Sequence, residues 1–155
     1  MAATLALAVA GCGFHLAGSY RLPPALAKPY LSFSDPYTDF AHEFELQLKS
    51  AGAAIQGDGQ AATATIDVTK DLAQQRVLSV SATNIPTEYE LVYTVTFSVR
   101  GADKVLIAPQ TISQTRDYSF EEQIVLAKQH EADVLRAQMA RDLAAIAMRR
   151  LTSLK

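Results

Sequence analysis

Apolar and polar side chains alternate most regularly around residues 89–99 of this 155-residue chain. Every second position there is apolar, namely Tyr89, Leu91, Tyr93, Val95, Phe97 and Val99. The positions between them include the hydroxyl side chains of Thr94, Thr96 and Ser98. Because successive side chains of a β-strand point to opposite faces, this alternation predicts a long strand with one buried and one polar face. The polar face suits either solvent or a hydrogen-bonded contact with another protein.

The period of two continues on both sides of this stretch. Residues 64–69 and 78–82 alternate in the same way, which predicts strand structure before the long strand. Residues 101–104 have the length of a hairpin loop, and residues 105–120 provide another strand. Pro109 within it indicates an edge strand or a bulge, because proline cannot donate to a β-ladder.

Two segments have a helical period instead. In the first, one apolar stripe is formed by Phe40, Phe44, Leu48 and Ala51. Asp35 followed by Pro36 offers an N-cap and a first helical residue, and Gly52 offers a C-terminal stop. The sequence therefore predicts an amphipathic helix between Asp35 and Gly52.

The second helical segment covers roughly Glu121 to Leu151. Ser119 and Glu122 before it have the spacing of a capping box, in which each side chain satisfies a backbone amide of the other residue. Apolar residues then continue at helical spacing, namely Ala132, Leu135, Met139, Leu143, Ile146 and Ala147. This pattern predicts a long helix with one apolar face.

With a short first strand at Tyr30–Phe33, the predicted order is strand, helix, three strands, helix. This order indicates an α+β fold, a two-layer sandwich with two helices packed on one face of a four-stranded, mostly antiparallel sheet. We assign residues 30–155 to this single domain. The preceding segment Arg21–Pro29 contains three prolines and is predicted to be extended.

The only cysteine of the chain, Cys12, follows an apolar run that begins at Leu5. Such a run is too short to span a bilayer and is typical of the apolar region and cleavage site of a secretory signal peptide. Val9-Ala10-Gly11-Cys12 resembles the bacterial lipobox, in which the cysteine is lipidated and becomes the mature N-terminus. We therefore expect residues 1–11 to be a signal peptide remnant and residues 12–29 to be a lipidated, extended leader.

Lipid on Cys12 would anchor the protein to a membrane. By resemblance to bacterial lipoproteins, the residue after the cysteine directs sorting, and Gly13 in place of aspartate favours the periplasmic face of the outer membrane. Met1–Thr4 lacks the positive charge that usually opens a signal peptide. The alternative is a buried cysteine in a core helix, which the flanking Gly11 and Gly13 disfavour.

Composition and motifs exclude several function classes. Hydrophobic residues make up 49% of the chain and the net charge is −2, which is typical of a globular domain without a basic field for nucleic acid. His15 stands alone, and His42 and His130 lack the second histidine that a zinc-protease helix needs. We expect no enzyme activity, no metal and no cofactor other than the lipid on Cys12.

Four short runs follow the lipobox in this order: Cys12–Leu16, Thr87–Leu91, Arg116–Tyr118 and Leu126–Glu131. None is diagnostic by itself, but their joint order resembles the LptE family, the small outer-membrane lipoprotein partners of the lipopolysaccharide-inserting barrel LptD. The resemblance implies a sandwich of two helices on a four-stranded sheet, in agreement with the patterns above. It also implies that the protein plugs an LptD-type barrel, assists its assembly and binds lipopolysaccharide.

The resemblance further suggests which cations contact lipopolysaccharide. Lys128 and Arg116 match basic residues of the family, and Arg76 is the cation nearest to Val77–Ile85, where relatives can carry an arginine. An arginine fork can bind phosphate bidentately, and lysine adds a point charge. Alternatively, Lys128 pairs with Glu131 on a solvated helix, and Arg116 only lays its stem on the rim of the core.

Two other functions remain open from the sequence. A lipid-binding lipoprotein without a barrel would need an apolar groove between helices and sheet. A structural lipoprotein of another envelope complex would have the lipobox but would lack the family's Thr-Glu-Tyr and Leu-Ala-Lys segments.

Overall fold

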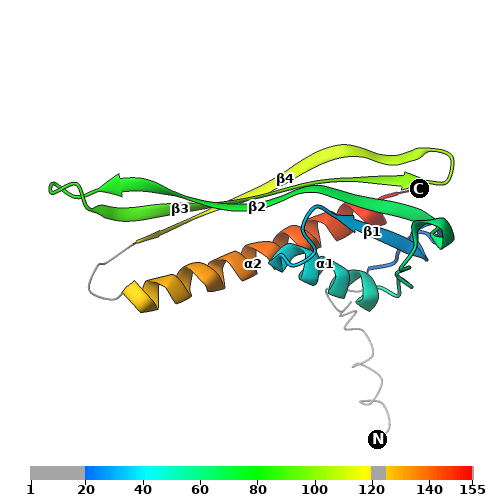
Figure 1. Ribbon diagram of the computed structural model, residues 1–155, viewed down its shortest axis with the longest axis horizontal. Coiled ribbons are helices and arrows are strands. Elements are labelled where there is room, and N and C mark those ends of the chain that lie inside the picture. The colour runs from blue at the N-terminus through cyan, green and yellow to red at the C-terminus, as the bar shows by residue number, and fades with distance from the viewer. Residues whose placement is uncertain (1–19, 120–124, 155) are drawn as a thin grey trace, which may run out of the picture.

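The computed structural model describes residues 20–119 and 125–154, except for the side chains of residues 125–129. The helices and strands in chain order are η1 (Pro24–Leu26), β1 (Pro29–Phe33), α1 (Asp39–Ser50), η2 (Gly59–Ala61), β2 (Ala64–Val80), β3 (Pro86–Gly101), β4 (Val105–Ser119) and α2 (Val125–Thr152). Figure 1 shows both α-helices on one side of a long twisted sheet. The predicted α+β sandwich is confirmed.

The four strands lie in the order β1-β2-β3-β4. β1 is parallel to β2, whereas β2 with β3 and β3 with β4 are antiparallel. β1 pairs only with Ala64–Val68, so the remainder of β2 extends past it. In Figure 1 the closed end of the β2–β3 hairpin also projects beyond the first described turn of α2.

The core lies between the sheet and the helices, and its residues follow the predicted periodicities. The helix-facing side of β3 contributes Leu91, Tyr93, Val95, Phe97 and Val99, all of them buried, whereas Tyr89 at the start of the predicted apolar face is only half-buried. The α1 stripe contributes the fully buried Phe40, Phe44 and Leu48, and α2 contributes Met139, Leu143 and Ala147. Burial of these apolar side chains supplies the main driving force for folding.

The first turn of α1 differs from the prediction. Asp35 does not cap the helix; its Oδ1 accepts a hydrogen bond from the amide of Tyr37 at 2.9 Å and forms a separate turn. The N-cap is Thr38, whose Oγ1 accepts from the amide of Ala41 at 3.1 Å. At the other end the prediction is confirmed, because Gly52 adopts φ +89°, a backbone conformation that glycine enters without strain.

The proline-rich segment is not extended throughout. Pro24 begins the short 3-10 helix η1, where its fixed φ suits the first helical position. Leu26 at the end of η1 is fully buried in the core. The end of this segment therefore packs on the domain.

The strand predicted for residues 78–82 is confirmed only as far as Val80. Residues 78–80 are the end of the long strand β2, and Ser81 and Ala82 lie in the loop that follows. Leu78 and Val80 expose 48% and 50% of their surface. A register shift between Val77 and Ser79 breaks the alternation here, and this part of the hairpin projects beyond α2. Apolar alternation therefore does not mark a buried face at this end of the sheet.

β4 confirms the expectation for Pro109. It is an edge strand, and Ala108 and Pro109 together oppose the single residue Ser98 in a bulge. The capping box proposed for residues 119–122 lies mostly outside the described residues.

Candidate functional site

The sheet face away from the helices carries a ladder of hydroxyl groups on two neighbouring strands. Thr94 lies opposite Ser113, and Thr96 lies opposite Thr111. The hydroxyls of Thr96 and Thr111 are 2.9 Å apart and form a hydrogen bond. Ser98, which the sequence placed on the same face, is nearly buried beside the bulge. The β4 half of this ladder could be found only from the register of the hairpin.

Arg76 lies on this hydroxyl-bearing face of the sheet. It is paired with Glu90 on the adjacent strand, and its guanidinium forms an ion pair with the Glu90 carboxylate. The hydrogen bond and charge of Glu90 raise the pKa of Arg76. Because its nearest charge partner is already a carboxylate, Arg76 is a poor first contact for a phosphate.

Arg116 lies on the opposite face, the one that the helices cover. Its strand neighbour is Leu91, and its Nη2 is 3.8 Å from Oδ2 of Asp142 on α2. Both side chains are 53% exposed, so this pair is worth no more than about 1 kcal/mol and leaves the guanidinium accessible. The position of Arg116 on the helix-covered face agrees with the strand parity read from the sequence.

The three candidate lipopolysaccharide contacts therefore do not form one cluster. Arg76 and Arg116 lie on opposite faces of the sheet, as their register partners Glu90 and Leu91 require. Lys128 belongs to α2, on the same side as Arg116, but its side chain lies outside the described residues. Cys12 also lies outside them.

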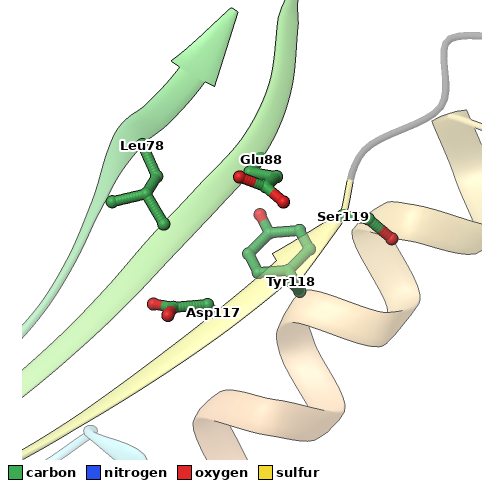
Figure 2. A pocket seen from close by; sticks show the side chains of 5 residues that line it. All are labelled: Leu78, Glu88, Asp117, Tyr118 and Ser119. Carbon is green, nitrogen blue, oxygen red and sulfur yellow. The ribbon is translucent and has the colours of Figure 1, made fainter.

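A hollow of about 340 Å³ opens near the closed end of the β2–β3 hairpin. Figure 2 shows its lining residues, Leu78 from β2, Glu88 from β3, and Asp117, Tyr118 and Ser119 from β4. The ring of Tyr118 stacks on Tyr89 with centroids 5.7 Å apart. Its described lining residues include two carboxyl groups and no cation, which disfavours an anionic ligand here.

A second hollow, of about 290 Å³, lies where α1 begins beside β2. The Thr38 hydroxyl donates to Oδ2 of Asp71, and the backbone amide of Phe40 donates to the Tyr93 hydroxyl at 3.3 Å. Oδ1 of Asp71 is buried without a hydrogen-bond partner among the described residues. Arg136 of α2 also lines this hollow.

Burial dominates the acid–base properties of this group. Desolvation raises the pKa of Asp71, and the hydrogen bonds from Thr38 and Tyr93 only partly oppose that effect. Desolvation and the neighbouring Asp71 also raise the pKa of Tyr93. Asp71 could not be found from the sequence, because the register shift between Val68 and Lys70 changes which β2 residues face the helices.

We expect Asp71→Asn to alter the pH dependence of stability. Because the pKa of Asp71 is raised in the folded state, the native protein binds this proton more tightly than the unfolded chain does. The Asp71 contribution to stability is therefore present at acid pH and is lost as pH rises through the folded pKa. Chemical unfolding from pH 3 to 8 measures the free energy of unfolding of both proteins. The difference between Asp71→Asn and the parent should increase with pH in favour of the variant. The exposed Asp103→Asn is the control, and an equal pH trend in both variants would contradict the assignment.

The described residues contain no group of three or more His, Cys, Asp or Glu side chains that could hold a metal ion. His42 is exposed on α1, and His130 is exposed on α2. None of the described helices is long and apolar enough to cross a membrane.

Comparison with known proteins decides the family. The family model for LptE, described as lipopolysaccharide-assembly, matches residues 28–151. This chain belongs to the LptE family. The match includes all four strands, α1 and all of α2 except its last residue.

Individual LptE-family relatives agree with this assignment. The chain is 33% identical over 150 residues to the LPS-assembly lipoprotein LptE of Yersinia enterocolitica, covering 90% of this chain and 67% of that protein. It is 31% identical over 148 residues to LptE of Yersinia pestis, covering 94% and 70% of the two chains.

Solved structures share the fold of this LptE-family chain. The solution structure of lipoprotein B from Nitrosomonas europaea superposes with a TM-score of 0.74 at 25% identity, covering 91% of each chain. The crystal structure of the rare lipoprotein B from Shewanella oneidensis gives a TM-score of 0.69 at 26% identity, covering 81% of this chain and 94% of that one.

Proposed function

We propose that this protein is an outer-membrane lipoprotein that acts in lipopolysaccharide assembly. The observation that carries the proposal is the LptE family match over residues 28–151, with relatives named LPS-assembly lipoprotein. Cys12 behind its apolar run supplies the lipid anchor, and Gly13 directs the protein to the periplasmic face of the outer membrane.

Within that role, the protein partners and plugs an LptD-type β-barrel and assists its assembly. The lumen of a large outer-membrane barrel is polar, so a plug inside it must present polar surface. The hydroxyl ladder of Thr94, Thr96, Thr111 and Ser113 supports this arrangement, because hydroxyls donate and accept hydrogen bonds without the desolvation cost of charges.

Co-purification from outer membranes tests the partnership. The tagged full chain is extracted in mild detergent from cells that express an LptD-type barrel, and its complexes are separated by size. We expect the barrel to elute with the tagged protein in a fixed ratio. Recovery of the tagged protein without the barrel would contradict the proposal and would favour a structural or lipid-binding lipoprotein of another envelope complex.

The protein also binds lipopolysaccharide, and we place the contact on the side of the sheet that carries Arg116 and α2. Arg116 has an accessible guanidinium held by a weak ion pair with Asp142, and Lys128 belongs to the helix on that side. Arg76 is the third candidate, but the Glu90 ion pair makes it the weakest. Phosphate groups of the glycolipid would replace the Asp142 carboxylate as the partner of the Arg116 guanidinium.

We expect the double variant Arg116→Glu with Lys128→Glu to bind purified lipopolysaccharide at least about tenfold more weakly, because it removes two donors and adds repulsion. Fluorescence titration at low and moderate salt measures the affinity, and circular dichroism checks the fold. The matched control is Arg100→Glu with Lys104→Glu, an equal change in net charge near the β3–β4 loop. Equal affinities for the two double variants would show that Arg116 and Lys128 are not specific contacts.

A further inference from the structure

Among the described residues, nothing pairs with one edge of β2 over much of its length. β1 pairs with β2 only up to Val68, and the α1 cap Thr38 contacts Asp71. From Leu72 to Val80 the described part of the chain pairs with β2 on the β3 side only. The pairing with β3 runs without a break from Lys70 to Val77, so this edge is regular backbone with one unpaired row of amides and carbonyls.

Exposed apolar side chains gather on the same segment. Four of the eight large hydrophobic residues that are exposed in the described part of the chain belong to it, namely Leu72, Val77, Leu78 and Val80. Tyr37, which is 95% exposed, lines the hollow beside Leu72. An unpaired strand edge flanked by exposed apolar side chains is a template for an additional strand.

The opposite edge of the sheet lacks these properties. β4 contains Pro109 and a bulge, and Val105 is its one exposed large apolar residue. Its remaining exposed side chains include the hydroxyls of Thr111 and Ser113 and the charge of Asp117. Proline, bulges and charges are the features by which natural sheets prevent strand addition. The two edges therefore differ in kind, and only β2 offers an acceptor.

Charge identifies the chemistry of the incoming strand. The hollow near the start of the free edge is lined by Asp39 and Asp71 against the single cation Arg136. The hollow near its end is lined by Glu88 and Asp117, and its described lining residues include no lysine or arginine. Arg76 on the same segment of β2 is already paired with Glu90. Figure 2 shows Leu78 of β2 across from these carboxyl groups. A complementary segment alternates apolar residues with lysine or arginine, whereas an acidic segment or a phosphate is repelled.

We infer that the β2 edge from Leu72 to Val80 accepts an extended segment of a partner protein as a fifth strand, and that this segment carries alternating apolar and basic side chains. Main-chain hydrogen bonds hold the strand, and the two hollows select its side chains. This inference goes beyond the proposed lipopolysaccharide-assembly role, and it stands whether or not the barrel co-purifies.

The probe is a capped ten-residue peptide that alternates valine and lysine, added to the purified full chain in detergent. Hydrogen–deuterium exchange by mass spectrometry reports the protection of each backbone segment. We expect exchange in residues 72–80 to slow at least about tenfold at saturating peptide, with residues 105–119 unchanged. The same peptide with glutamate in place of lysine should leave residues 72–80 unprotected.

Two matched variants separate strand addition from general charge attraction. Leu72→Lys should weaken the peptide at least about tenfold, because it places a like charge on the free edge. Val105→Lys changes the net charge equally on the β4 edge and should bind the peptide as the parent does.

The inference is overturned if the lysine peptide protects both edges alike, if both variants weaken it equally, or if no segment gains protection. It is also overturned if the chain already self-associates through residues 72–80 without peptide, since the occupant is then a second copy. None of these results bears on the barrel test, which reads co-elution from outer membranes.

Discussion

Replacing Tyr93 with aspartate is expected to unfold the domain. Tyr93 lies in the middle of β3 with only 2% of its surface exposed, and its hydroxyl accepts from the amide of Phe40. Truncating a buried aromatic residue costs about 3–5 kcal/mol, and burying an unpaired carboxylate adds several more. Asp71 lies next to this position, so a second carboxyl group there would also be repelled. The sum is comparable to the whole stability of a small domain, about 5–15 kcal/mol.

Thermal unfolding followed by circular dichroism measures this effect. Thr94→Asp is the matched control, because it places the same carboxylate one residue away on the hydroxyl-bearing face and should cost no more than about 1 kcal/mol. Tyr93→Phe keeps the ring and should lose about 1–2 kcal/mol with the hydroxyl. If Tyr93→Asp melts together with Thr94→Asp, the assignment of the buried face is wrong.

Replacing Cys12 with alanine is expected to release the protein from the membrane. The thiol is the only site in the chain to which a lipobox-type modification can attach acyl chains. Each buried methylene of such a chain contributes about 0.8 kcal/mol, so several chains hold the protein firmly, whereas their loss removes the anchor completely. We therefore expect a shift from almost entirely membrane-bound protein to almost entirely soluble protein.

Fractionation after a high-salt wash, in cells that lack an LptD-type barrel, measures the shift without a partner to retain the variant. Ser50→Ala, an equally small change on the exposed surface of α1, is the control and should remain with the membrane. Recovery of Cys12→Ala in the washed membrane pellet would show that something other than lipid on this residue anchors the protein.

The periodicity of the chain predicted the elements where they pack against each other. The alternation in β3 and the apolar stripes of α1 and α2 indicate which side chains are buried. This pattern lies within each element, because each element has one buried face. The position of Pro109 likewise predicted its edge strand and bulge, because the missing amide restricts proline wherever it occurs.

Predictions failed where a feature depends on contacts between distant segments. Asp35 has the sequence pattern of a helix cap, but Thr38 fits both the amide of Ala41 and the carboxylate of Asp71 on β2. Leu26 follows two prolines and is nevertheless drawn into the core. In both cases a tertiary partner outweighs the local preference.

For the candidate site, the residues could be named from the sequence but their grouping could not. The family resemblance selected Arg76, Arg116 and Lys128 together, whereas strand pairing places Arg76 against Glu90 and Arg116 on the opposite face. A shift of one residue in register exchanges the faces of a strand, and β2 contains such shifts at both ends of its regular stretch.

The sequence by itself therefore determined the fold class, the buried face of β3 and the two helices, because each follows from local periodicity. Only the tertiary structure decided that Leu78 and Val80 are exposed, that Asp71 is desolvated beside Tyr93, and that the edge of β2 beyond Val68 has no strand partner in the described part of the chain. These properties depend on where β1 and the helices stop covering the longer strands, and that limit is set by the packing of elements far apart in the chain.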